Sequence, residues 1–105
     1  MSRRAAKIDA SQPAIVEALR AIGCTVQSLA EVGDGCPDLL VAINRVNVLM
    51  EVKDGSRVPS ERLLTPAQKR WHAAWRAPVH LVETVDQALA IVDFYRGAAR
   101  VRAGR

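Results

Sequence analysis

The chain has 105 residues, half of them hydrophobic and a quarter charged, which is typical of one small folded domain and excludes a disordered chain. Its formal net charge of +4 favours a polyanionic partner. The sequence lacks a run of about 18 apolar residues, and no apolar segment follows the basic N-terminus, so we expect neither a membrane span nor a secretory signal.

The charge is unevenly distributed along the chain. Residues 1–24 and 55–105 carry net charges of +2 and +5, whereas residues 25–54 carry −3. A protein that only binds phosphate groups has no need of an acidic centre. A metal-dependent enzyme that acts on nucleic acid does need one, so this layout favours a cation site between two basic flanks.

The first predicted elements are a helix and three strands. Apolar residues recur at helical spacing over residues 11–22, and Gly23 follows as a typical helix end. Three short apolar segments come next, separated by turn-forming residues, and they predict strands over residues 25–31, 38–43 and 47–53. The turn at Asn44 and Arg45 predicts that the last two strands pair as a hairpin.

The second half contains a long polar connection, two helices and one strand. The connection over residues 54–63 is long for a compact domain, which is typical of a functional loop. Thr65 and Pro66 start a predicted helix that reaches about Trp75. A strand over residues 79–82 and a further helix starting after Thr84 complete an α/β fold, with a mixed sheet flanked by helices.

This layout divides the chain into a basic arm over residues 1–8, one domain over residues 9–96 and an Arg-rich tail over residues 97–105, which we expect to fray. Cys24 and Cys36 are not in a CxxC pattern, so we interpret them as reduced thiols of a cytoplasmic protein rather than as zinc ligands.

One acidic pattern carries candidate chemistry. Glu51 and Lys53 lie two residues apart on a predicted strand and so point to the same face, and Asp38 starts the partner strand beside them. Two carboxylates and the backbone carbonyl of Val52 are hard-oxygen ligands suited to Mg²⁺. Lys53 could then orient a water and stabilise charge on an attacked phosphate. The alternative is a buried ion pair between Lys53 and one of the acids.

Four segments together resemble the virus-type replication–repair nuclease (VRR-Nuc) family of the PD-(D/E)xK nuclease superfamily, and in particular its minimal stand-alone members in phages and bacteria. They span about residues 8–92 and are residues 9–20, 35–41, 51–54 and 64–68. The resemblance implies a restriction-endonuclease-like αβββαβ core with an extra C-terminal helix. It also implies Asp38 and Glu51 as ligands of Mg²⁺ or Mn²⁺, Lys53 as the catalytic lysine, and Gln68 as a glutamine that faces the site.

Two positions in this resemblance leave alternatives open. Gln68 is also the third residue of a helix that starts after Thr65, so its side chain could cap the helix, serve the site, or do both. The family usually has a Glu four residues before the glutamine of its first helix. In this chain Ile8 occupies that position and Asp9 lies three residues before Gln12, so Asp9 is either a third acidic site residue or a helix cap.

The remaining candidates are less specific. Gln12 and the basic residues of the second half could contact DNA, although each basic residue could equally belong to a solvated surface: Arg57, Arg62, Lys69, Arg70 and Arg76. Glu17 is expected on the surface. His72 could contact phosphate, but a partly buried position on the tryptophan face of its helix is the better interpretation, and His80 is interpreted as structural.

The resemblance implies a DNA endonuclease that leaves a 5′-phosphate and a 3′-hydroxyl, with four-way (Holliday) junctions as substrate, in the cytoplasm of a bacterial or phage-infected cell. Such a junction presents two symmetric strands, so we expect a homodimer. The alternatives are a non-catalytic DNA-binding module on the same fold and a nuclease that acts on linear, flapped or RNA substrates.

Overall fold

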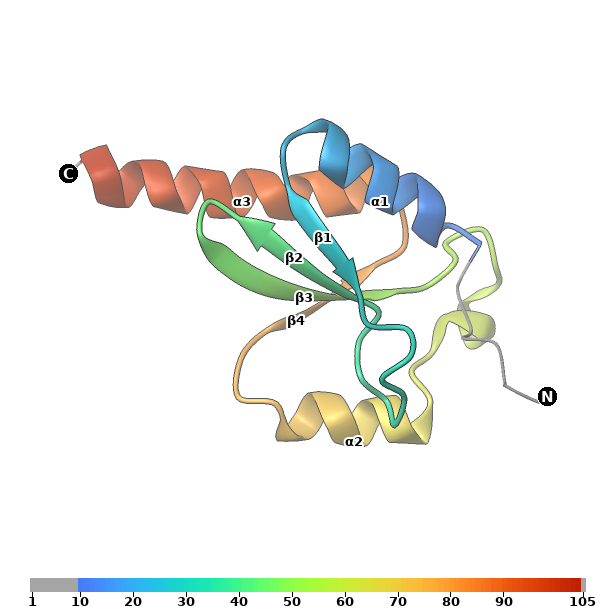
Figure 1. The fold of residues 1–105 in the computed structure, drawn as a ribbon. Helices are drawn as coiled ribbons and strands as arrows, with labels where there is room; N and C mark the ends of the chain where they lie inside the picture. Colours follow the sequence, from blue (N-terminus) through green and yellow to red (C-terminus); the bar gives the residue numbers. More distant parts are fainter. Residues whose placement is uncertain (1–9, 105) are drawn as a thin grey trace.

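The computed structural model describes residues 10–104, which form a four-stranded sheet with helices on both sides (Figure 1). The elements follow the predicted order, with one short 3-10 helix in the polar connection. They are α1 (Gln12–Ala21), β1 (Thr25–Ser28), β2 (Leu39–Ile43), β3 (Val46–Val52), η1 (Pro59–Arg62), α2 (Pro66–Ala74), β4 (Val79–Val82) and α3 (Val85–Gly104).

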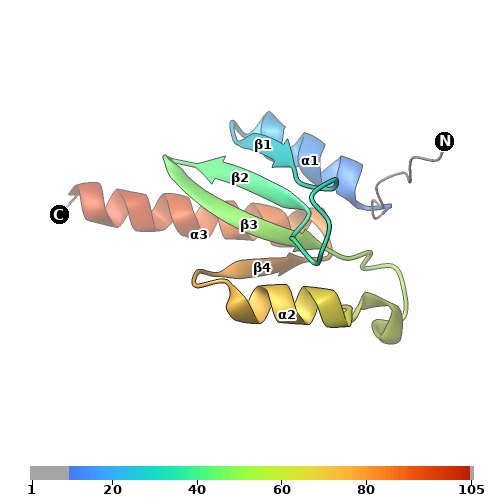
Figure 2. The same cartoon turned by 60° about the horizontal axis from the view of Figure 1, so that its bottom comes forward.

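The sheet is mixed, as predicted, and its strands lie in the order β1-β2-β3-β4. The first three strands are antiparallel, and β4 pairs in parallel with β3, so that Val52 lies opposite Val82. Helices α1 and α3 cover one face of the sheet and α2 lies over the other (Figures 1 and 2). The parallel pairing requires a crossover, and the chain makes it through α2.

The hydrophobic core lies between the sheet and the α1–α3 layer. It is built from aliphatic side chains contributed by both helices and all four strands, including Ile15, Leu19, Met50, Val82 and Val92. Strand β3 is the most deeply placed, since its last five residues are all buried. Any charge on β3 is therefore removed from water, which is costly unless it is paired or binds a cation.

The β2–β3 hairpin was predicted correctly, and its turn explains the register. Asn44 and Arg45 both have positive φ angles, 48° and 70°, and connect the paired residues Ile43 and Val46. Two consecutive residues in the left-handed region form the two-residue turn that matches the twist of a hairpin.

Two predicted boundaries were wrong. Strand β1 ends at Ser28 rather than near residue 31, because the Ser28 hydroxyl accepts a hydrogen bond from the Ala30 N–H (3.2 Å) and the chain turns there. Helix α3 continues past Gly97, where the tail was predicted to begin, as far as Gly104. Alanine and arginine are good helix formers, and one glycine costs only about 1 kcal/mol within a helix.

The predicted basic arm over residues 1–8, and Asp9 after it, lie outside the described residues. Within residues 10–104, no helix has both the length and the apolar composition that crossing a membrane requires. Cys24 and Cys36 are both free thiols.

Candidate active site

The candidate residues converge at one end of the sheet. There β3 ends, β2 begins, and the N-terminal ends of α1 and α2 approach from opposite faces (Figure 1). The Ser11 hydroxyl, at the start of α1, donates to the Lys53 carbonyl at 3.4 Å, and the Gln68 side chain, in the first turn of α2, reaches Glu51 at 3.2 Å. Both helices thus lie against the end of β3.

Asp38 is held beside Glu51 by two hydrogen bonds to β3. Its backbone N–H donates to the Met50 carbonyl (3.1 Å), and its carboxylate oxygen Oδ2 accepts from the Val52 N–H (2.7 Å). These two partners are the residues on either side of Glu51. The two acids that the sequence pattern brought together are therefore neighbours in the structure.

The Glu51 side chain is almost fully buried, with 1% of its surface exposed. Its two carboxylate oxygens accept from two side chains of α2, because Gln68 Nε2 lies 3.2 Å from Oε2 and His72 Nε2 lies 3.1 Å from Oε1. A buried carboxylate requires such partners, since its desolvation is otherwise strongly unfavourable.

Gln68 both caps its helix and belongs to the site. Its Oε1 atom accepts from the Thr65 N–H and from Lys53 Nζ, each at 2.9 Å, while its own backbone N–H donates to the Thr65 hydroxyl at 3.1 Å. Its Nε2 atom donates to Glu51. The amide group thus connects Lys53 to Glu51, and the helix cap sets its position.

His72 contacts Glu51, which its interpretation as a residue on the tryptophan face of the helix did not predict. The available signal was its spacing of four residues from Gln68, which puts both side chains on one helix face. Burial and the Lys53 ammonium group lower the pKa of His72, and the negative charge of Asp38 raises it in part.

Cys36 also lies near the acids. Burial raises the pKa of its thiol, and the charges of Glu51 and Asp38 raise this pKa further.

The donor set fits a hard divalent cation. Asp38, Glu51 and the Val52 carbonyl offer oxygen ligands, the kind that Mg²⁺ and Mn²⁺ prefer. Gln12, in the first turn of α1, is 4% exposed, and its Oε1 atom has no hydrogen-bond partner among the described residues. Residues 10–104 contain no cluster of three or more His, Cys, Asp and Glu side chains able to hold a metal.

The basic candidates fall into two groups. Lys69, Arg70 and Arg76, on or next to α2, are exposed. Arg57 is exposed too, but it pairs with Asp54 (3.7 Å) and Glu61 (3.4 Å) in its own loop. The exposed residues near α2 are therefore the better placed to meet a polyanion.

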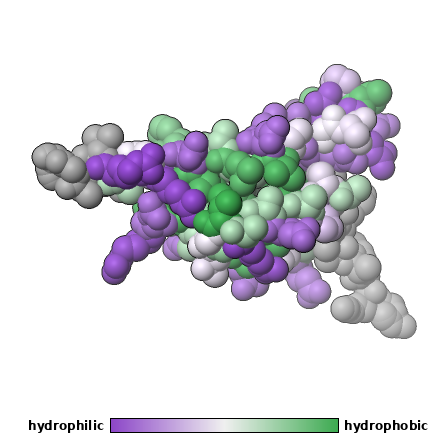
Figure 3. Space-filling view, turned by 90° about the horizontal axis from the view of Figure 1, so that it is seen from above, coloured by the Kyte–Doolittle hydropathy of each residue, from purple (hydrophilic) through white to green (hydrophobic). Residues whose placement is uncertain are grey.

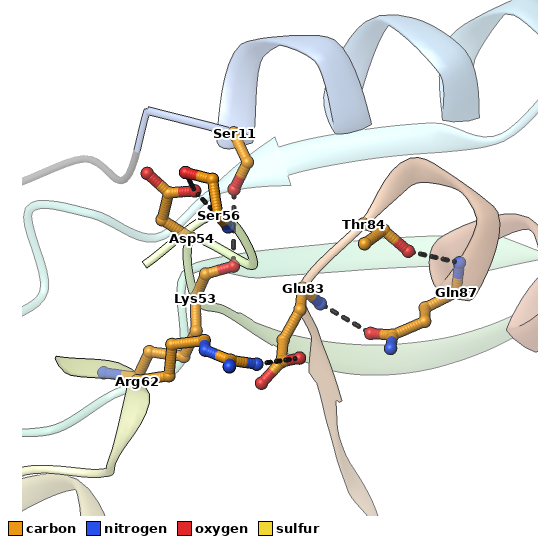
Figure 4. Close-up of polar contacts among 8 residues, drawn as sticks. All are labelled: Ser11, Lys53, Asp54, Ser56, Arg62, Glu83, Thr84 and Gln87. Carbon is orange, nitrogen blue, oxygen red and sulfur yellow. Dashed lines mark hydrogen bonds and ion pairs between the residues drawn. The ribbon is translucent and has the colours of Figure 1, made fainter. Parts of the chain in front are cut away.

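Arg62 helps to anchor the loop that follows Lys53. Its guanidinium group pairs with Glu83, after β4, at 2.9 Å (Figure 4). The Gly55 N–H donates to the Glu83 carbonyl at 3.3 Å. Asp54 accepts from the N–H and the hydroxyl of Ser56 at 3.0 and 2.7 Å. The contacts with Glu83 attach the loop to the body of the protein at the edge of the site, whereas those between Asp54 and Ser56 stabilise the turn within it.

The other predicted surface and structural residues lie where expected. Glu17 is exposed on α1. His80 lies on the opposite face of the sheet from Glu51, where its Nε2 atom is 2.7 Å from the Tyr95 hydroxyl of α3. Neither residue contacts the site.

The helix, three antiparallel strands, helix and parallel strand define the PD-(D/E)xK class of nuclease fold, with Glu51 near the end of β3, Lys53 directly after it and Asp38 just before β2. No family model matches the sequence, and no curated protein matches it. A solved structure described as "VRR_NUC domain" is similar, with a TM-score of 0.60 and 33% sequence identity over 81% of this chain and 92% of that chain. The chain belongs to the VRR-Nuc family.

Family membership indicates the general activity of the protein and the kind of substrate on which it acts. It implies a nuclease of the PD-(D/E)xK type, and therefore a nucleic acid substrate. Nucleases of this type typically use a divalent metal ion.

Proposed function

We propose that this protein is a Mg²⁺- or Mn²⁺-dependent, structure-selective DNA endonuclease that cuts four-way junctions. The observation that carries the proposal is the hydrogen-bonded series from Lys53 through Gln68 to Glu51, with Asp38 held beside it. A module that only binds DNA has no use for two adjacent buried or half-buried acids, which would repel the phosphate backbone.

In this proposal each residue has a distinct role. Asp38, Glu51 and the Val52 carbonyl would hold the cation, which would supply Lewis-acid activation of the scissile phosphate. Lys53, directed by its hydrogen bond to Gln68, places its ammonium group beside the phosphate, orients the attacking water and stabilises the negative charge that develops. Hydrolysis leaves a 5′-phosphate and a 3′-hydroxyl.

The catalytic role of Lys53 is tested on a panel of four-way junctions, flaps, linear duplexes and single-stranded RNA, with Mg²⁺ and with EDTA. We expect junction cleavage that requires Mg²⁺, and a loss of about 10²–10³-fold in rate for Lys53→Ala with DNA binding retained. Faster cutting of linear DNA or RNA would contradict the substrate assignment. Salt-dependent binding without any cleavage would instead support a non-catalytic module.

Homodimer formation is the second part of the proposal, and an apolar groove between α2 and the sheet supports it. The groove has a volume of about 650 Å³ and is walled by aromatic and aliphatic side chains, including Leu40, Leu49, Trp71 and Trp75. Helix α2 has no buried residue, although it lies over a largely apolar sheet face. A second copy of the chain would bury the apolar sheet surface that α2 leaves exposed.

Helix α3 offers the alternative interface. Phe94 is 66% exposed, and Figure 3 shows apolar surface between hydrophilic areas on the side of the molecule seen from above. The groove is favoured because two stacked tryptophans, Trp71 and Trp75, with ring centroids 4.6 Å apart, form its wall, and Trp75 is 48% exposed. Large aromatic residues are typical of the centre of interfaces.

The interface is tested by sedimentation of the Trp75→Glu variant. We expect the wild-type protein to sediment as a dimer, and the dissociation constant of Trp75→Glu to rise at least about 30-fold, because a charge would be buried at the contact. Phe94→Glu and Leu63→Glu, each at a residue that is 66% exposed, serve as matched controls. A dimer lost only in Phe94→Glu would move the interface to α3, and a monomeric wild-type protein would refute the dimer.

A further inference from the structure

The hydrogen bond between His72 and Glu51 lies outside the D…ExK pattern that defines the site. His72 follows Gln68 by four residues on α2, so both side chains leave the same helix face. Each approaches a different oxygen of one carboxylate: Gln68 Nε2 lies 3.2 Å from Oε2, and His72 Nε2 lies 3.1 Å from Oε1. One helix thus supplies an N–H group to each Glu51 oxygen.

The hydrogen bond between His72 and Glu51 is largely shielded from solvent. The side chain of His72 is 15% exposed and that of Glu51 is 1% exposed. Water therefore competes weakly for the carboxylate, and the hydrogen bonds are stronger than they would be on the surface. A carboxylate held at both oxygens cannot rotate about its terminal torsion, which is otherwise broad.

The two contacts leave the carboxylate able to bind a cation. An ionised carboxylate has about four lone-pair sites, so each oxygen can accept one N–H group and still coordinate a metal ion. The imidazole donates through Nε2, since the carboxylate can only accept. His72 thus occupies the place of an outer-shell partner, a group that orients a metal ligand without touching the metal.

We propose that His72 is a positioning residue, which fixes the Glu51 carboxylate in the orientation required to bind a divalent cation. The inference rests on the proposed function only in taking Glu51 as a metal ligand. The competing explanation is that His72 merely fills space under α2, beside Trp71, whose ring it meets edge-on with centroids 6.3 Å apart. A space-filling role needs no N–H group, and the two explanations differ in that respect.

The test compares Mn²⁺ binding by full-length variants in the absence of nucleic acid, using calorimetry and the electron paramagnetic resonance signal of free Mn²⁺. His72→Leu keeps the volume and removes the donor, whereas His72→Gln restores an N–H group at a similar reach. His80→Gln is the matched control, because His80 contacts Tyr95 on the other face of the sheet. Melting temperatures without metal show whether each variant is folded.

We expect His72→Leu to bind Mn²⁺ about 10–100-fold more weakly than the wild-type protein, the usual effect of losing such a partner. His72→Gln should recover most of this loss, and His80→Gln should keep wild-type affinity. Wild-type affinity in His72→Leu, no recovery in His72→Gln, or no Mn²⁺ binding by the wild-type protein would each overturn the inference. A wild-type protein that binds Mn²⁺ but cuts no nucleic acid would refute the proposed function while leaving this inference to be decided by Mn²⁺ affinity.

Discussion

Glu51→Gln is expected to lower metal-dependent cleavage by at least about 10³-fold while the melting temperature stays within about 5 °C of the wild-type value. Gln has the shape of Glu but lacks the negative charge that attracts the cation. In the metal-free protein the charge of Glu51 lies in a site that is 1% exposed, and its desolvation is unfavourable. Gln avoids this desolvation but loses one of the two hydrogen bonds from Gln68 and His72, a loss of about 1 kcal/mol.

The matched control for Glu51→Gln is Glu17→Gln, which makes the same chemical change at an exposed position of α1. It should retain both cleavage and stability. Cleavage and thermal denaturation are measured on the same preparations of each variant. Substantial cleavage by Glu51→Gln, or an equal loss in Glu17→Gln, would show that Glu51 does not hold the metal.

Local sequence signals account for most of the fold. Three short-range features each determine a boundary with little influence from the rest of the chain. They are the helical spacing before Gly23, the turn at Asn44 and Arg45, and the cap at Thr65. The order of elements followed from them. The two boundary errors arose where a single residue was given too much or too little weight. The turn-forming contact of Ser28 was overlooked at the end of β1, and Gly97 was taken as the end of α3 although the Ala- and Arg-rich sequence after it favours a helix.

The pairing of Asp38 with Glu51 could also be predicted, because hairpin register is a local property once the turn is known. The link from Gln68 to Lys53 could be expected only through the family resemblance. The contact between His72 and Glu51 depends on how α2 lies across the sheet. That arrangement is set by packing between segments about 20 residues apart, which a periodicity argument does not determine.

The basic loop residues illustrate the same limit. Arg57 and Arg62 were candidates for DNA contacts by charge alone. In the structure Arg62 pairs with Glu83, 21 residues away, and so anchors the loop after Lys53. A charge count cannot separate a cation that faces a ligand from one that holds the fold together, because the difference lies in a partner distant in sequence.

Gly35, in the turn before Asp38, lies directly against the backbone of Ala67 and Gln68 at the start of α2. Gly35→Ala is expected to lower both the stability of the protein and its cleavage activity. The φ angle of Gly35 is +85°, and an added Cβ would lie 2.3 Å from the Ala67 carbonyl oxygen and 2.9 Å from the Gln68 backbone nitrogen. A non-glycine residue at positive φ costs about 1–2 kcal/mol, and relieving the clash adds about 1–3 kcal/mol. The free energy of unfolding should therefore fall by about 2–5 kcal/mol.

Gly33→Ala is the control that separates these two costs. Gly33 has nearly the same φ angle, +77°, but an added Cβ would meet no atom within 4 Å, so only the conformational cost of about 1–2 kcal/mol applies. Urea denaturation of both variants measures the difference. Because the clash forces the first turn of α2 away from Gly35, Gly35→Ala should also lose cleavage at temperatures where it remains folded, since Gln68 then no longer connects Lys53 to Glu51. Equal losses of stability in the two variants, with cleavage retained, would show that the contact between Gly35 and α2 does not position the site.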